Sequence, residues 1–166
     1  MPELKRWQEI ALNRKRQQEN SIPKEWRIPS LPSNLYNVTS IPTTCGILSE
    51  REILITEEND VEKLLQKLAS REWTAVDVIN ATLKRAAIAQ QLTNCLTEIY
   101  IEPALSRAQI LDNHLAQTGQ KFGPLHGLPV SLKDQFCIAG FETVMGTTFN
   151  YPLFTPNGLF KVMFPG

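Results

Sequence analysis

Gly123–Asp134 reads Gly-Pro-Leu-His-Gly-Leu-Pro-Val-Ser-Leu-Lys-Asp, and this stretch decides how the whole chain is interpreted. Its two glycines and two prolines predict a tight loop, because glycine tolerates unusual backbone angles and proline fixes φ. A short apolar strand is predicted directly after the loop, at Val130–Leu132. Lys133 would then lie at the carboxyl end of that strand, where ligands and reacting groups gather in open α/β sheets.

A lysine at this position has two interpretations. It can be a solvated side chain at a strand end that pairs with Asp134 or another acid. It can instead be partly removed from water, so that its neutral amine acts as a base. The residues by themselves leave both interpretations open.

Upstream of this stretch, helical and strand patterns alternate. Thr74, with Asp77 three residues later, predicts the capped start of a helix. Residues 96–101, Leu-Thr-Glu-Ile-Tyr-Ile, predict a short strand, Pro103 suits the first position of a new helix, and Gly119 can end that helix in a left-handed conformation. This order favours an α/β fold, in which helices cover a parallel or mixed sheet.

The N-terminal part is expected to be mostly helical. Residues 1–20 predict a basic amphipathic helix at the periphery of its own domain, with a helix lying on a membrane surface as the alternative. Prolines with Ser, Asn and Thr over residues 21–55 predict an extended connector. The main domain is expected over residues 56–146, with Thr56 as the N-cap of its first helix, and a divergent hydrophobic tail over 147–166.

Composition argues against several classes of protein. The 166 residues include 17 basic and 17 acidic side chains, and a net charge of zero gives no overall electrostatic grip on nucleic acid. No apolar run is long enough to span a bilayer. The first residues lack the apolar core of a signal peptide, so a cytoplasmic protein without stable membrane insertion is expected.

Cysteines and histidines predict neither a disulfide framework nor a metal site. Cys45, Cys95 and Cys137 are far apart and form no Cys-x-x-Cys pair, and His114 and His126 lack the spacing of metal ligands. We therefore expect no metal and no other cofactor. Cys137 has no matching His motif nearby and is expected to be a small thiol rather than a nucleophile.

Gly123–Asp134 resembles the lysine motif of the amidase signature family, whose members commonly read Gly-Pro-Leu-His-Gly-Ile-Pro followed by a short strand, Lys and Asp. The likeness covers roughly residues 5–148 and is closest to the fungal acetamidase-like branch. Outside the motif, the similar segments are Trp7–Ile10, Pro23–Arg27, Thr74–Tyr100, Gln135–Phe136 and Gly140–Thr143.

The resemblance implies hydrolysis of small-molecule carboxylic amides to an acid and ammonia or an amine. The family uses a Ser–cis-Ser–Lys triad, in which the lysine is a base that acts through the bridging serine on the nucleophilic serine. Of these three groups only the lysine carries over, to Lys133. In the family both serines lie in a Gly/Ser-rich segment further on, whereas this sequence has no Gly-Ser-Ser or Gly-Gly run. Ser131 does not match the family's nucleophile, although it shares a predicted strand face with Lys133.

The resemblance thus implies the N-terminal helical part of the amidase signature fold with the first strands of a mixed sheet, as an incomplete domain. The similarity fades after Gly146, so we expect a chain truncated before both serines and inactive as written. The alternative is a non-catalytic fragment that acts as a binding or regulatory module for a full-length amidase. Neither the particular amide nor the oligomeric state follows from the sequence.

Overall fold

The computed structural model describes residues 6–30, 36–134 and 136, which belong to two units. The first unit contains residues 6–21 together with 130–134 and 136. The second contains residues 22–30 and 36–129. The second unit is therefore the larger of the two, and it holds the loop that leads to the lysine.

The first unit begins with α1 (Arg6–Ser21), which confirms the predicted N-terminal helix. None of its side chains is fully buried, and Trp7 is 53% exposed. In the described residues, no helix is both long enough and apolar enough to cross a membrane. Docking of α1 on its own domain stays a prediction.

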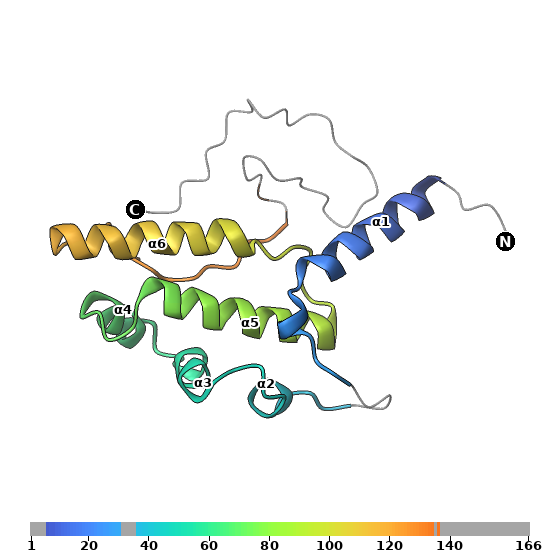
Figure 1. Ribbon diagram of the computed structural model, residues 1–166, viewed down its shortest axis with the longest axis horizontal. Coiled ribbons are helices and arrows are strands. Elements are labelled where there is room, and N and C mark those ends of the chain that lie inside the picture. The colour runs from blue at the N-terminus through green and yellow to red at the C-terminus, as the bar shows by residue number, and fades with distance from the viewer. Residues whose placement is uncertain (1–5, 31–35, 135, 137–166) are drawn as a thin grey trace. The chain divides into compact units, whose positions relative to one another are not determined.

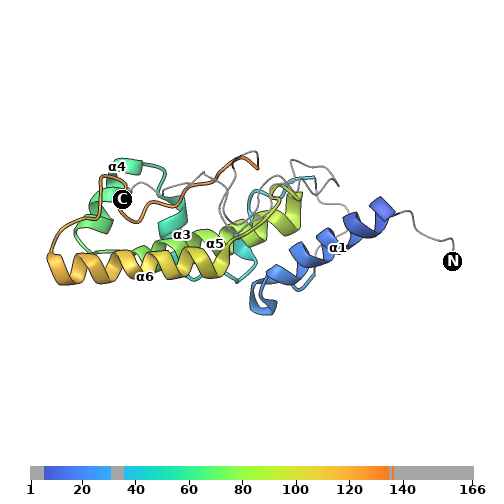
Figure 2. The ribbon, with the colours of Figure 1, turned by 90° about the horizontal axis from the view of Figure 1, so that it is seen from above.

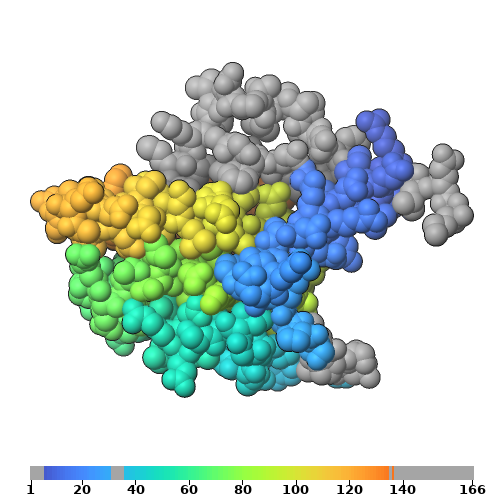
Figure 3. Space-filling model, viewed as in Figure 1, coloured from blue at the N-terminus to red at the C-terminus, as the bar shows by residue number. Residues whose placement is uncertain are grey.

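The second unit is organised around one central helix, α5 (Ala75–Thr93). α6 (Ile101–Thr118) runs antiparallel to it on one side, while α3 (Glu50–Glu57) and α2 (Ile41–Thr44) pack on another side (Figure 1, Figure 2). α4 (Val61–Ala69) lies near the beginning of α5 (Figure 1). The side chains of α5 and α6 lie against each other along the pair (Figure 3). Because neighbours cover α5 on more than one side, it buries residues around most of its circumference.

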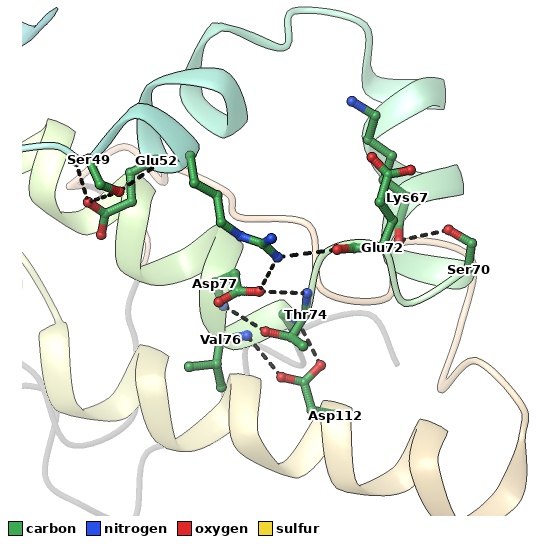
Figure 4. Close-up of polar contacts among 11 residues, drawn as sticks. Ser49, Glu52, Lys67, Ser70, Glu72, Thr74, Val76, Asp77 and Asp112 are labelled. Atoms are coloured by element: carbon green, nitrogen blue, oxygen red, sulfur yellow. Dashed lines mark hydrogen bonds and ion pairs between the residues drawn. The ribbon is translucent and has the colours of Figure 1, made fainter.

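Side-chain caps fix where these helices begin. Ser49 and Glu52 form a reciprocal capping box at α3, and Asp60 accepts hydrogen bonds from two backbone N–H groups at α4. Thr74 and Asp77 form a second capping box at α5, as the sequence predicted (Figure 4). Each box satisfies N–H groups that a helix start would otherwise leave without partners.

The prediction that Thr56 is an N-cap is wrong. Thr56 lies in the last turn of α3, where its hydroxyl donates to the carbonyl of Glu52 at 2.9 Å. The stronger start signals lie on either side, at Ser49 and Asp60, and they divide this region into two short helices.

The proline-rich segment is also more ordered than an extended tether. It contains the short 3-10 helix η1 (Lys24–Trp26) as well as α2 and α3. Gln91 of α5 holds the segment by its side-chain amide, which donates to the carbonyl of Trp26 and accepts from the N–H of Ile28, both at 2.9 Å. As domain boundaries, the expected divisions after residues 20, 55 and 146 stay predictions.

Three ion pairs join α3 to α5. Lys84 lies 2.6 Å from Glu52, and both side chains are largely buried. Burial alone would raise the pKa of Glu52, but hydrogen bonds from Lys84 and Ser49 outweigh it and hold that pKa below its ordinary value of 4.5. The two more exposed pairs are Arg51 with Asp77 at 3.0 Å and Arg85 with Glu57 at 2.6 Å.

The buried side chains form two apolar clusters along α5. The larger lies where α4, α5 and α6 meet, and the smaller lies between η1 and the second half of α5. The larger contains Ile55, Leu64, Leu68, Trp73, Ala75, Val78, Ala81 and Ala108. The smaller contains Ile22, Trp26, Leu83 and Ala87.

The two predicted strands are not found, and the described residues contain no sheet. Residues 96–100 are irregular, because the N–H of Leu96 donates to the side chain of Gln90 at 2.6 Å and Ile101 already begins α6. Val130–Leu132 is irregular and exposed, without a ladder partner in the part of the chain that the structure describes. The predicted helix is confirmed, but it begins at Ile101, so that Pro103 is its third residue and not its first. It ends at Gly119 with φ +68° as predicted.

Candidate active-site segment

A tight loop connects α6 to the lysine-bearing segment. The N–H of His126 donates to the carbonyl of Gly123 at 3.2 Å, and the N–H of Leu128 donates to that of Leu125 at 3.1 Å. Gly127 is the third residue of the second turn and has φ +78°. The predicted loop is therefore confirmed as two overlapping turns that only glycine joins without strain.

Gly127 also brings the loop into close contact with the helices. A Cβ atom at this position would lie 3.0 Å from the Cδ2 of Leu68 and 3.1 Å from the Cβ of Ala75. Leu68 belongs to α4, and Ala75 is the first residue of α5. The absence of a side chain at residue 127 therefore lets the loop pack directly on the corner between two helices.

His126 closes the loop from inside. Its side chain is buried, at 3% exposure, and its Nδ1 accepts the N–H of Phe122 at 3.1 Å. Because Nδ1 accepts, the neutral ring carries its proton on Nε2. Nε2 is buried and has no hydrogen-bond partner among the described residues. Burial lowers the pKa of His126, and the nearby carboxylate of Asp112 opposes that effect.

Phe122 ties the other end of the loop to α6. The guanidinium of Arg107 lies 4.7 Å from the centre of the Phe122 ring, and the His114 ring meets it edge-on at 5.0 Å. Arg107 and His114 both belong to α6 and lie about two helical turns apart on the same side of it. Cation–π and edge-to-face contacts of this kind each stabilise the loop modestly.

Asp112 fastens α6 to the beginning of α5. Its two carboxylate oxygens accept the backbone N–H groups of Ala75 at 2.7 Å and Val76 at 3.0 Å (Figure 4). These are the first N–H groups of α5, where the helix dipole favours negative charge. The corner on which the loop packs is thus held by a charge from the neighbouring helix.

Lys133 lies beyond this anchored loop, in the first unit. Its side chain is exposed, and in the described residues its ammonium makes no ion pair with Asp134. The Lys133 carbonyl accepts the N–H of Phe136 at 3.0 Å. Ser131 is exposed as well, while one carboxylate oxygen of Asp134 is buried and finds no hydrogen-bond partner within the described residues. The described part of the chain therefore neither neutralises Lys133 nor removes it from water.

The remaining candidate residues form no second centre. Cys95 is exposed and Cys45 is half-buried, and the structure describes both as free thiols. Cys137 lies outside the described residues. Within the described ranges, no three His, Cys, Asp or Glu side chains come together as metal ligands would.

Known proteins are similar to this chain in sequence. The family model named Amidase matches residues 77–156, which include the loop and Lys133. The acetamidase of Emericella nidulans is 46% identical over 140 residues, covering 84% of this chain and 25% of the relative. The chain belongs to the amidase signature family. The acetamidase of Aspergillus oryzae is 42% identical over 139 residues, with 84% of this chain and 25% of the relative covered.

The amidase signature fold is also the one that a solved structure supports. Fatty acid amide hydrolase matches with a TM-score of 0.71 and 32% identity, over 79% of this chain and 24% of that one. The chain spans about a quarter of the length of these amidases. The helical part of the expected fold is therefore supported, whereas the expected sheet has no strand among the described residues.

Two residues of the amidase loop region were not singled out from the sequence. His126 has no metal-ligand spacing, and the signal that points to it is its place within the lysine motif. Asp112 gives no local signal, since its partners lie 36 and 37 residues away in the chain.

Proposed function

We propose that these residues form the lysine-bearing part of an enzyme that hydrolyses small carboxylic amides to an acid and ammonia or an amine. The observation that carries this proposal is the intact lysine motif in a chain that matches two fungal acetamidases at 46% and 42% identity. We assign to Lys133 the role of base in a Ser–cis-Ser–Lys triad.

In the proposed reaction the neutral amine of Lys133 accepts a proton from the bridging serine, which in turn accepts the proton of the nucleophilic serine. The serine oxygen bonds to the amide carbonyl carbon, the C–N bond breaks, and the leaving nitrogen takes up the proton. Water then hydrolyses the acyl ester and restores the serine. Backbone N–H groups would stabilise the tetrahedral oxyanion.

This role requires surroundings that keep the Lys133 amine neutral, because an exposed lysine is protonated near pH 7. The two serines that such a lysine would serve have no counterpart in the 166 residues. We therefore propose that this polypeptide by itself does not turn over amides. A cytoplasmic location and the absence of a cofactor stay predictions.

A chimera tests the proposal. Residues 5–148 replace the matching part of the Emericella nidulans acetamidase, and ammonia release from acetamide is measured. The folded chimera should be active, and Lys133→Ala should lower kcat by roughly 10²–10⁴-fold, as expected for loss of a general base.

Lys63→Ala is the matched control, because Lys63 is an exposed lysine of α4 that pairs with Asp60 of its own helix start at 3.7 Å. Its kcat should equal that of the parent chimera. Equal kcat values for Lys133→Ala and the parent would refute the assignment, and turnover by the 166-residue chain that is lost in Lys133→Ala would refute the need for further residues.

A further inference from the structure

We propose that His126 is a positioning residue for the lysine-bearing segment: its neutral imidazole closes the loop from which that segment leaves, and a proton on Nδ1 opens the loop. The catalytic consequence rests on the proposed function of Lys133. The structural step does not, because the loop belongs to the second unit and can be observed without any reaction.

The first argument is the hydrogen bond that the imidazole makes. Nδ1 of His126 accepts the N–H of Phe122, and the two residues stand at opposite ends of a four-residue span. A proton on Nδ1 would turn the acceptor into a donor that faces another donor. Protonation therefore removes the hydrogen bond that closes the loop.

The second argument is the position of the loop in the chain. Gly127 follows His126 directly and packs on Leu68 and Ala75 with no room for a side chain. Lys133 comes six residues after Gly127. A loop that stays closed therefore fixes the point from which the lysine-bearing segment starts, whereas an open loop leaves that starting point undefined.

The third argument is the burial of a polar group that has no structural partner. Nε2 of His126 carries the proton of the neutral ring, yet it is buried without an acceptor in the part of the chain that the structure describes. A histidine kept only for packing would be replaced by an apolar side chain at lower cost. The Nδ1 acceptor is the function that an apolar residue could not supply.

The surroundings set the pH range of the change. Burial lowers the pKa of His126 below 6.5, so the neutral, closed form prevails at neutral pH and the proton binds only in more acidic solution. One nearby charge attracts the proton and three groups repel it: Asp112 attracts it, whereas His114, Lys121 and Arg107 repel it. Leu68 and Ala75, which pack on the adjacent Gly127 from α4 and α5, bring no charge.

Hydrogen exchange of the full 166-residue chain tests the structural step. Mass spectrometry follows the peptide that contains Phe122, at pH 7.5 and pH 5.0, after correction for the intrinsic exchange rate. In the unmodified chain, protection of the Phe122 amide should fall at least about tenfold between the two pH values, since one hydrogen bond closes this amide.

Three variants separate the imidazole's chemistry from its bulk. His126→Asn places an amide oxygen near the position of Nδ1, so it should keep the Phe122 amide protected at both pH values. His126→Leu offers no acceptor and should leave that amide unprotected at both. His114→Asn changes the other histidine of the chain, whose ring touches Phe122, and the fall in protection between the two pH values should persist in it because His126 is unchanged.

Protection that does not change with pH in the unmodified chain would overturn the proposal, and so would protection retained in His126→Leu. If His126→Leu fails to fold, the His126→Asn variant still tests the proposal. If protection of the Phe122 amide depends on pH equally in His126→Asn and in the unmodified chain, His126 is not the titrating group.

The catalytic step is measured in the chimera, as kcat for acetamide against pH. His126→Asn should retain kcat at pH 7.5 and lose less activity than the parent below pH 6.5. Identical profiles would refute coupling between the loop and Lys133. These outcomes are distinct from failure of the proposed function, which appears instead as an active Lys133→Ala chimera.

Discussion

Removing the Asp112 carboxylate should destabilise the second unit more than removing a local helix cap. In the structure this carboxylate accepts two N–H groups of α5 at 2.7 and 3.0 Å, from a position on α6 (Figure 4). Asp112→Ala leaves both donors without their charged partner and separates the two longest helices of the unit at one point.

The size of the effect follows from these two bonds. A hydrogen bond to a charged group contributes roughly 1.5–3 kcal/mol, but Asp112 is half-buried and water can reach part of the vacated space. The Thr74–Asp77 box also continues to cap α5. We therefore expect Asp112→Ala to lower the free energy of unfolding by about 2–3 kcal/mol.

The assay is urea unfolding followed by far-UV circular dichroism at 222 nm, with the midpoint and the slope m both fitted. Asp60→Ala is the control, because Asp60 caps α4 through two bonds within the same helix, and its loss should cost about 1 kcal/mol. Asp112→Asn keeps the shape without the charge and should fall between the two. A loss below about 0.5 kcal/mol for Asp112→Ala, with m unchanged, would refute the reasoning.

Two further changes test the loop and the α3–α5 contact. Gly127→Ala should lower the free energy of unfolding by about 2–4 kcal/mol, because φ is +78° and the new methyl group would lie 3.0 Å from Leu68; an unchanged urea midpoint would contradict this. Glu52→Gln should lower the free energy of unfolding at pH 7 and make that free energy less dependent on pH in acidic solution. The pKa of Glu52 is lowered in the folded state, so its contribution is present above pH 4.5 and is lost as pH falls further; thermal midpoints of Glu52→Gln and the parent that decline in parallel below pH 4.5 would disprove it.

The sequence predicted those features whose causes are local. The capping box of Thr74 and Asp77 spans three residues, and the left-handed Gly119 needs only the helix before it. The loop of Gly123–Pro129 was likewise predicted because its glycines and prolines act on their own backbone. For these elements the physical reason and the sequence signal are the same thing.

The features that could not be predicted depend on distant partners. Residues 96–101 would form a strand only if another strand paired with them, and here a side chain of α5 accepts the N–H of Leu96 instead. The bonds of Asp112 depend on how α5 and α6 come together, which no short pattern encodes. Lys133 was located by its motif, and its exposure in the described residues agrees with the solvated one of the two interpretations that the sequence left open.

The amide of Gln91 has a consequence for how this fold can vary. It donates to the backbone carbonyl of Trp26 and accepts from the backbone N–H of Ile28. One side chain thus pairs with the backbone of this segment as a neighbouring strand would. Because both partners are backbone atoms, the interaction recognises the path of that segment and not its side chains. A proline at position 28 would remove this bond, because it has no N–H to donate, while position 91 requires a group that both donates and accepts at the reach of a glutamine.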